Sequence, residues 1–179
     1  MNKNIVILTG SPRKNSSSAR LAAAFADGAK TAGHDVTVFR VAGMKIGGCL
    51  GCDHCFDGQG VCVQKDDMLQ IFDALRRADT LVLVSPVYFW SITSQLKQAI
   101  DRMYALLKEG TKIKRAVLLM TCGDDTDEAA QPSIAMFRKI CAYLKWQIAG
   151  IIVAPNLNAP EEIEGRVELE QAKNLGSEI

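Results

Sequence analysis

A hydroxyl-rich, basic segment follows the first apolar run of the chain and could bind a phosphate. Residues 5–9 are apolar, residues 10–18 read Gly-Ser-Pro-Arg-Lys-Asn-Ser-Ser-Ser, and a helical pattern begins at Ala19. The N-terminus of a helix presents unpaired N–H groups and the positive end of its dipole to an anion. Serine hydroxyls add donors, arginine can bind a phosphate with two donors at once, and a helix cap needs only one serine. We therefore expect a phosphate site formed by Ser11, Arg13, Ser16, Ser17 and Ser18.

A second segment carries four of the six cysteines, at Cys49, Cys52, Cys55 and Cys62. Four thiolates can ligate a [4Fe–4S] cluster, and two consecutive two-residue spacings are typical of bacterial cluster ligation. Zinc fits less well, because structural zinc sites usually combine two separated cysteine pairs. Two other interpretations stay open: thiols that only shape a binding pocket or a subunit contact, and a redox disulfide between Cys49 and Cys52.

Two further segments, each following an apolar run, could lie against a flat ring system. Residues 80–84 lead into three consecutive aromatic side chains, and residues 116–121 lead into a glycine. Three adjacent aromatics are awkward to bury together, so a ligand or a partner surface is as good an interpretation as core packing. Glycine lets a backbone approach a ligand closely. The residues expected to line the ring are Pro86, Val87, Tyr88, Phe89, Trp90, Thr121, Cys122 and Gly123.

These segments must be positioned by an alternation of strands and helices. Apolar runs predict strands at residues 5–9, 36–39, 80–84, 116–121 and 149–153. Helical spacing predicts helices at residues 19–30, from residue 66 onward, and at 93–107, 128–144 and 167–175. Such an α/β alternation predicts a parallel sheet with helices on both faces, in the order 2-1-3-4-5. A ligand is then expected at the carboxyl ends of the strands, between strands one and three.

Composition limits the classes of function. The chain has 179 residues, 48% of them hydrophobic, and a formal net charge of +1, so we expect one domain over residues 1–179 and neither nucleic acid nor membrane as a partner. The N-terminus shows no signal-peptide pattern and no apolar run is long enough to span a membrane, so a cytoplasmic location is expected. There, cysteines indicate metal, cluster or redox chemistry before structural disulfides.

One phosphate site and one flat-ring site together suggest FMN. The Gly-x-Gly-x-x-Gly pattern of tight dinucleotide binding is absent after the first strand. We therefore expect a nicotinamide nucleotide to bind transiently, over the exposed face of the flavin.

Five short motifs occur in a characteristic order: residues 10–14, 49–55, 66–68, 85–88 and 96–102. Together they resemble the NADPH-dependent FMN reductase-like flavoproteins of the flavodoxin superfamily, and in particular the branch that includes the iron–sulfur flavoproteins. The resemblance covers nearly the whole chain. It implies a flavodoxin-like three-layer fold, bound FMN, and a homodimer or homotetramer with the flavin near the subunit interface. Many relatives carry glycine near position 90, where this chain has Trp90.

The expected function is an FMN-dependent oxidoreductase that passes electrons from NAD(P)H through FMN to a small acceptor, such as a flavin, a quinone, or a nitro- or azo-aromatic compound. No acid or base side chain is assigned as catalytic. The first alternative is an iron–sulfur electron carrier that receives electrons from a ferredoxin through a cluster on the four cysteines. The second is a non-catalytic module that senses flavin or redox state. Lys97, Asp101 and Arg102 are interpreted as structural residues that orient their helix or a subunit contact.

Overall fold

Five parallel strands form the centre of the computed structural model, which describes residues 2–57 and 60–179. Their spatial order is β2-β1-β3-β4-β5, and every neighbouring pair is parallel, which confirms the predicted flavodoxin-like sheet. The strands are β1 (Asn4–Thr9), β2 (Asp35–Arg40), β3 (Thr80–Pro86), β4 (Arg115–Thr121) and β5 (Gln147–Ala154).

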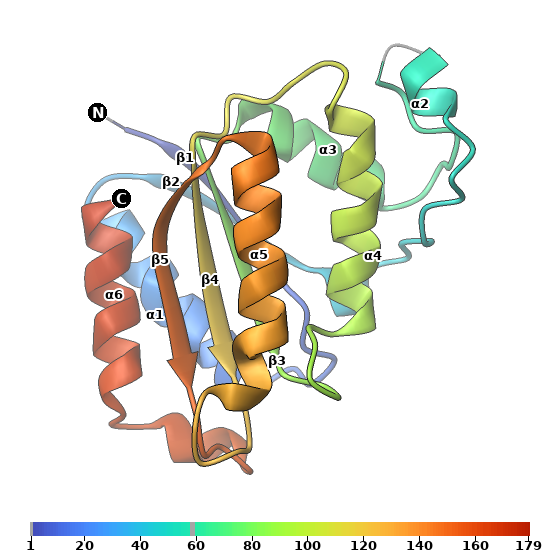
Figure 1. Ribbon diagram of the computed structural model, residues 1–179. Coiled ribbons are helices and arrows are strands. Elements are labelled where there is room, and N and C mark those ends of the chain that lie inside the picture. Colours follow the sequence, from blue (N-terminus) through green and yellow to red (C-terminus); the bar gives the residue numbers. More distant parts are fainter. Residues whose placement is uncertain (1, 58–59) are drawn as a thin grey trace.

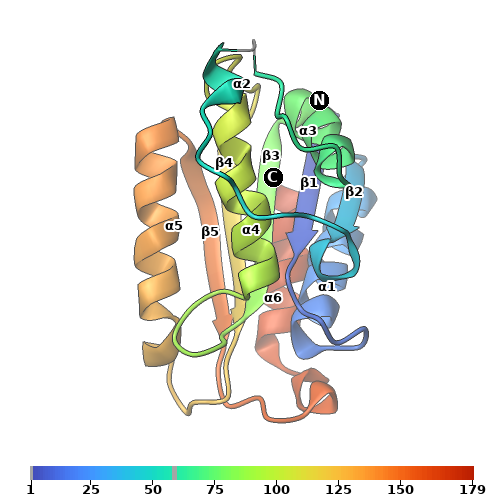
Figure 2. The same ribbon diagram turned by 90° about the vertical axis from the view of Figure 1, so that its right-hand side faces the viewer.

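Helices cover both faces of this sheet. One face is covered by α1 and α6, and the other by α3, α4 and α5 (Figure 1, Figure 2). The helices are α1 (Ser17–Thr31), the short α2 (His54–Asp57), α3 (Met68–Arg77), α4 (Ser94–Arg102), α5 (Gln131–Leu144) and α6 (Val167–Glu178). Short 3-10 turns are η1 (Val41–Gly43), η2 (Met103–Leu106), η3 (Glu128–Ala130) and η4 (Pro160–Ile163).

The inner strands β1, β3 and β4 are largely apolar because each of their faces has its own core, whereas the edge strand β2 is more polar and more exposed. Successive side chains of a strand point to opposite faces, so Ile5 and Ile7 pack beneath α1 and α6, whereas Val6 and Leu8 pack beneath α3 and α4. All four side chains are at most 3% exposed. All five strands run in the same direction, so their carboxyl ends meet at one edge of the sheet.

Several helix ends differ from the predicted boundaries; for example, α5 begins at Gln131 instead of residue 128, and α6 ends at Glu178 instead of residue 175. The helix expected over residues 93–107 ends at Arg102 and continues as the 3-10 turn η2. The helix expected from residue 66 begins at Met68, because the Asp66 carboxylate accepts from the Met68 N–H at 3.1 Å and also binds the backbone of a preceding loop. Among the described residues, no helix is both long enough and apolar enough to cross a membrane.

Candidate functional site

A cavity of about 100 Å³ lies where the carboxyl ends of β1, β3 and β4 meet. The structure brings the three predicted segments together here, as expected from the switch in strand order between β1 and β3. The lining includes ten of the thirteen residues expected to bind phosphate or ring: Ser11, Arg13, Ser16, Ser17, Pro86, Val87, Tyr88, Thr121, Cys122 and Gly123. The cavity is smaller than a pocket that encloses a cofactor, so an occupant of the size of FMN would extend over its open rim.

The serines of the first loop have different structural roles. Ser16 caps α1, since its Oγ accepts from the Ala19 N–H at 3.1 Å. Ser18 is 2% exposed, bonds to Ser16 Oγ at 3.1 Å and does not line the cavity, because its helical position turns it inward. Ser17 donates to the carbonyl oxygens of residues 159 and 160 at 3.3 and 3.4 Å. Arg13 is exposed and pairs with no acid in the described part of the chain, which leaves its guanidinium available to an anion.

A buried hydrogen-bond network holds these loops in register. The Thr93 hydroxyl donates to the Gly10 carbonyl at 2.8 Å, and the Thr93 N–H donates to Ser85 Oγ at 3.0 Å. Thr93 also caps α4 by accepting from the Leu96 N–H. Because Ser85 and Thr93 are fully buried, they position the phosphate-site loop relative to the aromatic loop without touching an occupant. Sequence reasoning missed both residues.

The aromatic loop forms a tight turn, and two of its three rings lie outside the cavity lining. Tyr88 and Ser91 pair through two backbone hydrogen bonds of 2.8 and 3.1 Å, which places Phe89 and Trp90 at the tip of a tight turn. Both tip residues have positive φ, 47° and 60°, and their side chains are 92% and 58% exposed. The cavity is lined by Tyr88 but by neither tip residue, so a contact of Phe89 and Trp90 with the ring stays a prediction.

Backbone strain at this tip leads to the first prediction. A turn with two positive-φ residues favours asparagine and glycine, and a left-handed L-residue costs about 1–2 kcal/mol. Trp90→Gly should therefore raise the free energy of unfolding by about 0.5–1 kcal/mol, after the greater entropy of glycine in the unfolded chain is subtracted. Trp90→Ala removes the same ring but keeps the strain, so it is the matched control. Urea unfolding that ranks alanine at or above glycine would contradict this interpretation.

The four clustered cysteines line a second, small cavity with Asp53, Arg102 and Tyr104. All four thiols are free, so the Cys49–Cys52 disulfide considered above is not formed here. Burial raises the pKa of the Cys55 thiol, and the proximity of Cys62 and Cys49 raises it further. No three Cys, His, Asp or Glu side chains are arranged as a ready-made site for a single metal ion in residues 2–57 and 60–179.

This cysteine cavity lies away from the carboxyl-end cavity. Arg102 is the last residue of α4, which begins beside the carboxyl end of β3 and runs back toward the amino ends of the strands. Figures 1 and 2 accordingly show α2 at the end of the sheet opposite to the loop that precedes α1. The two cavities share no lining residue among those described. Within one chain, the cysteines therefore do not shape the carboxyl-end cavity.

A family model for NADPH-dependent FMN reductase matches residues 3–158. The chain belongs to the NADPH-dependent FMN reductase family. An iron–sulfur flavoprotein of Methanocaldococcus jannaschii is 35% identical over 107 residues, which cover 60% of this chain and 54% of that protein. One from Archaeoglobus fulgidus is 35% identical over 96 residues, covering 54% of this chain and 43% of the relative. The chain thus spans about half the length of these curated relatives.

Solved structures of similar shape agree with the flavodoxin-like fold of this FMN reductase family member. An azoreductase from Bacillus anthracis str. Sterne has a TM-score of 0.76 at 18% identity, with all of both chains covered. A NAD(P)H:quinone oxidoreductase from Methanothermobacter marburgensis has a TM-score of 0.73 at 18% identity, covering 99% of this chain and 96% of the other. At such identities the likeness shows the fold alone.

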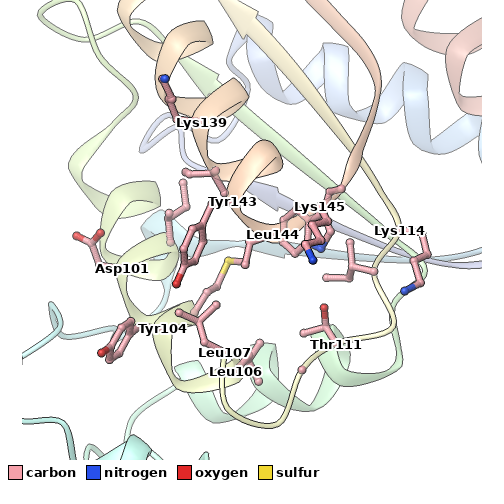
Figure 3. Close-up of a pocket in the computed structure, with 16 residues that line it drawn as sticks. Asp101, Tyr104, Leu106, Leu107, Thr111, Lys114, Lys139, Tyr143, Leu144 and Lys145 are labelled. Atoms are coloured by element: carbon pink, nitrogen blue, oxygen red, sulfur yellow. The ribbon is translucent and has the colours of Figure 1, made fainter.

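A larger cavity of this reductase family member lies elsewhere. It is a groove of about 770 Å³ between the α4–η2 segment and α5, with Tyr104 and Tyr143 at one end and Lys139, Lys145 and Lys114 around it (Figure 3). Most of its lining is aliphatic or aromatic, and Lys97 and Asp101 form a surface ion pair nearby at 2.6 Å. The groove has no hydroxyl cluster and lies away from the carboxyl ends of β1 and β3, so the smaller cavity is the better candidate for the functional site.

Sequence reasoning also missed a fourth wall of the carboxyl-end cavity. The loop after β5 contributes Leu157, Asn158, Ala159 and Pro160. Their residue types carry no phosphate or ring signal, but their position after the carboxyl end of the fifth strand would have indicated them.

Proposed function

We propose that this FMN reductase family member is an FMN-dependent oxidoreductase, which takes electrons from NAD(P)H and passes them to a small aromatic or quinoid acceptor. One observation carries the proposal: three loops line one cavity at the switch in strand order. They are the serine–arginine loop after β1 and the loops that contain residues 86–88 and 121–123. Bound FMN supplies the chemistry, since a flavin accepts a hydride from a nicotinamide and gives up the electrons to a second compound.

The residues around the cavity fit the two ends of FMN. Ser11, Arg13 and Ser17, together with the N-terminus of α1, offer hydroxyl, guanidinium and N–H donors to a phosphate. The ring would lie against the backbone of residues 86–88 and 121–123 and against the side chain of Tyr88. Backbone N–H groups of these segments would stabilise negative charge that develops on the ring. A homodimer or homotetramer remains a prediction of the family resemblance.

The proposal is tested by an anaerobic absorbance spectrum of the purified protein, with FMN added if none co-purifies. We expect the two-banded flavin spectrum to bleach on addition of NADPH or NADH and to return with a quinone or an azo compound. Protein that neither carries nor takes up FMN would overturn the proposal. Bound FMN that neither nucleotide bleaches, in protein without iron, would instead indicate the non-catalytic binding module.

The phosphate assignment gives a prediction of its own. Arg13→Gln should weaken FMN binding about tenfold, because a charge-assisted, two-donor contact with phosphate is lost. Lys14→Gln removes the same charge from the same exposed loop, but Lys14 does not line the cavity, so its effect should be at most about twofold. Quenching of FMN fluorescence measures both affinities. Equal losses in the two variants would mean that only the overall charge of the loop matters.

A second candidate function, an electron carrier with a [4Fe–4S] cluster, is favoured by the cysteine cavity. Its donor set fits the group, because four free thiols line one cavity beside a buried guanidinium. Cys49, Cys52, Cys55 and Cys62 would hold the cluster, which exchanges single electrons when bound. Iron and acid-labile sulfide near four per chain, after anaerobic assembly, would support this candidate. Their absence would leave the FMN proposal intact.

A further inference from the structure

The loop that carries the four cysteines is closed at its base by three polar side chains. The residues just before the first cysteine meet those just after the last. Asp66 Oδ2 accepts from the Gly47 N–H at 2.9 Å, and Gln64 Nε2 donates to the Gly48 carbonyl at 3.0 Å. From a different element, Arg102 Nη1 donates to the Gly47 carbonyl at 3.0 Å. These hydrogen bonds of Asp66, Gln64 and Arg102 side chains therefore hold the two ends of the cysteine loop together.

Arg102 is the residue that joins these contacts at the base of the loop. It is 2% exposed and forms a two-pronged ion pair with Asp66, with Nη1–Oδ2 and Nη2–Oδ1 distances of 2.7 and 3.1 Å. Both Asp66 oxygens are also engaged by backbone N–H groups, of Gly47 and Met68. Arg102 also lines the cysteine cavity and is the one basic residue in its described lining. An ion pair with Asp66 that only anchored α4 would not require this position.

One nitrogen atom of this buried guanidinium has no partner at all among the described residues. Arg102 Nε is buried and has no hydrogen-bond partner in residues 2–57 and 60–179. A buried N–H without an acceptor is costly, and an acceptor that the protein chain does not itself supply would remove that cost. Cys62 lines the same cavity as Arg102, as do the other three clustered cysteines. Thiolate and sulfide sulfur are the acceptors that this cavity would provide.

We propose that Arg102 is a positioning residue for a cluster in the cysteine cavity: it fixes the base of the loop and directs a permanently charged N–H donor to the sulfur of Cys62 or of the cluster. This inference rests on the second candidate function. Its physical basis is that net charge and hydrogen bonds to the sulfurs set the stability and the reduction potential of an iron–sulfur cluster. Four thiolates and a [4Fe–4S] core carry net negative charge, so they would accept strongly from an N–H of the guanidinium, whose own charge Asp66 already balances.

The test compares wild-type protein with Arg102→Gln, Arg102→Lys and, as a control, Lys97→Gln, which loses a cation from the same helix but outside the cavity. Each is assembled anaerobically with iron and sulfide. Three properties are then measured: iron and sulfide content, the rate of iron loss to a chelator, and the midpoint potential of the cluster by EPR-monitored titration. FMN content is measured separately.

We expect Arg102→Gln to lose iron at least fivefold faster than wild type and its cluster to have a more negative midpoint potential, because a positive charge and an N–H···S bond are removed. In iron loss and in midpoint potential, Arg102→Lys should lie between wild type and Arg102→Gln. Lysine keeps the positive charge but lacks the planar guanidinium with its paired N–H donors. Lys97→Gln should behave as wild type, and FMN content should be unchanged in all. If Arg102→Gln does not fold, the lysine variant carries the test through its faster iron loss.

Wild-type potential and wild-type iron retention in a folded Arg102 variant would overturn the inference. So would wild-type protein that binds no iron, which would also refute the second candidate function. In that case FMN binding and bleaching by NAD(P)H would still decide the oxidoreductase proposal independently.

Discussion

Asp66→Ala should lower the free energy of unfolding by about 3–5 kcal/mol, because it leaves the Arg102 guanidinium buried without its counter-charge. The pair is a strong case of this effect: the side chains are 1% and 17% exposed, and the closest N–O distance is 2.7 Å. The substitution also removes the acceptors of the Gly47 and Met68 N–H groups, which further weakens the base of the cysteine loop. Urea unfolding followed by circular dichroism measures the loss.

Asp73→Ala is the matched control. Asp73 pairs with Arg76 at 3.1 Å on the surface, where its side chain is 65% exposed, so its loss should cost less than about 1 kcal/mol. If the two alanine variants unfold at the same urea concentration, the buried pair does not stabilise the fold in the way described.

The Asp66–Arg102 ion pair should make the free energy of unfolding depend on pH, and the sign of this dependence can be predicted. Burial alone would raise the pKa of Asp66, but hydrogen bonds from Arg102, Gly47 and Met68 outweigh burial and lower the pKa below its ordinary value. A carboxyl whose pKa is depressed in the folded state stabilises the fold above its unfolded pKa, and that contribution is lost as the pH falls through the folded pKa. Below about pH 4 the gap in stability between wild type and Asp66→Ala should therefore narrow.

Much of the architecture could be predicted because it depends on local patterns. Continuous apolar runs such as residues 80–84 are typical of strands buried on both faces, and the alternation of such runs with helices restricts the sheet to few orders. The loops at the carboxyl ends then meet whatever their composition, which is why the serine–arginine loop and the residues 121–123 lie together. The family assignment follows from the same ordered motifs, and the match over residues 3–158 confirms it.

What could not be predicted depends on contacts between distant residues or on backbone conformation. Arg102 looks like a surface residue in the helical pattern, and only the end of α4 at that position turns it toward Asp66, 36 residues earlier. The aromatic run at residues 88–90 indicates a ring contact by composition alone. The backbone pairing of Tyr88 with Ser91 instead places Phe89 and Trp90 outside the cavity, and no residue type in the segment predicts that turn.

The second large effect is expected at Gly10, where the phosphate-site loop touches α4. A Cβ atom at this position would lie 2.4 Å from Thr93 Oγ1 and 2.7 Å from Leu96 Cβ. Neither neighbour can yield cheaply, because the Thr93 hydroxyl is bonded to the Gly10 carbonyl and Leu96 is fully buried in the helix. The loop itself must therefore move, and with it the hydroxyl and N–H donors of the phosphate site.

Gly10→Ala should weaken FMN binding about a hundredfold, since displacing a preorganised site by about 1 Å costs on that order, and should lower the free energy of unfolding by about 1–3 kcal/mol. Fluorescence titration with FMN and urea unfolding measure the two effects on one preparation. Gly48→Ala is the control, because a Cβ there meets open space and the cysteine loop lies away from this cavity. A Gly10→Ala protein that unfolds early but binds FMN normally would show that the Gly10–Thr93 contact supports the fold without positioning the phosphate loop. A Gly10→Ala protein that keeps its stability but loses FMN binding would show that the Gly10–Thr93 contact positions the phosphate loop without stabilising the fold.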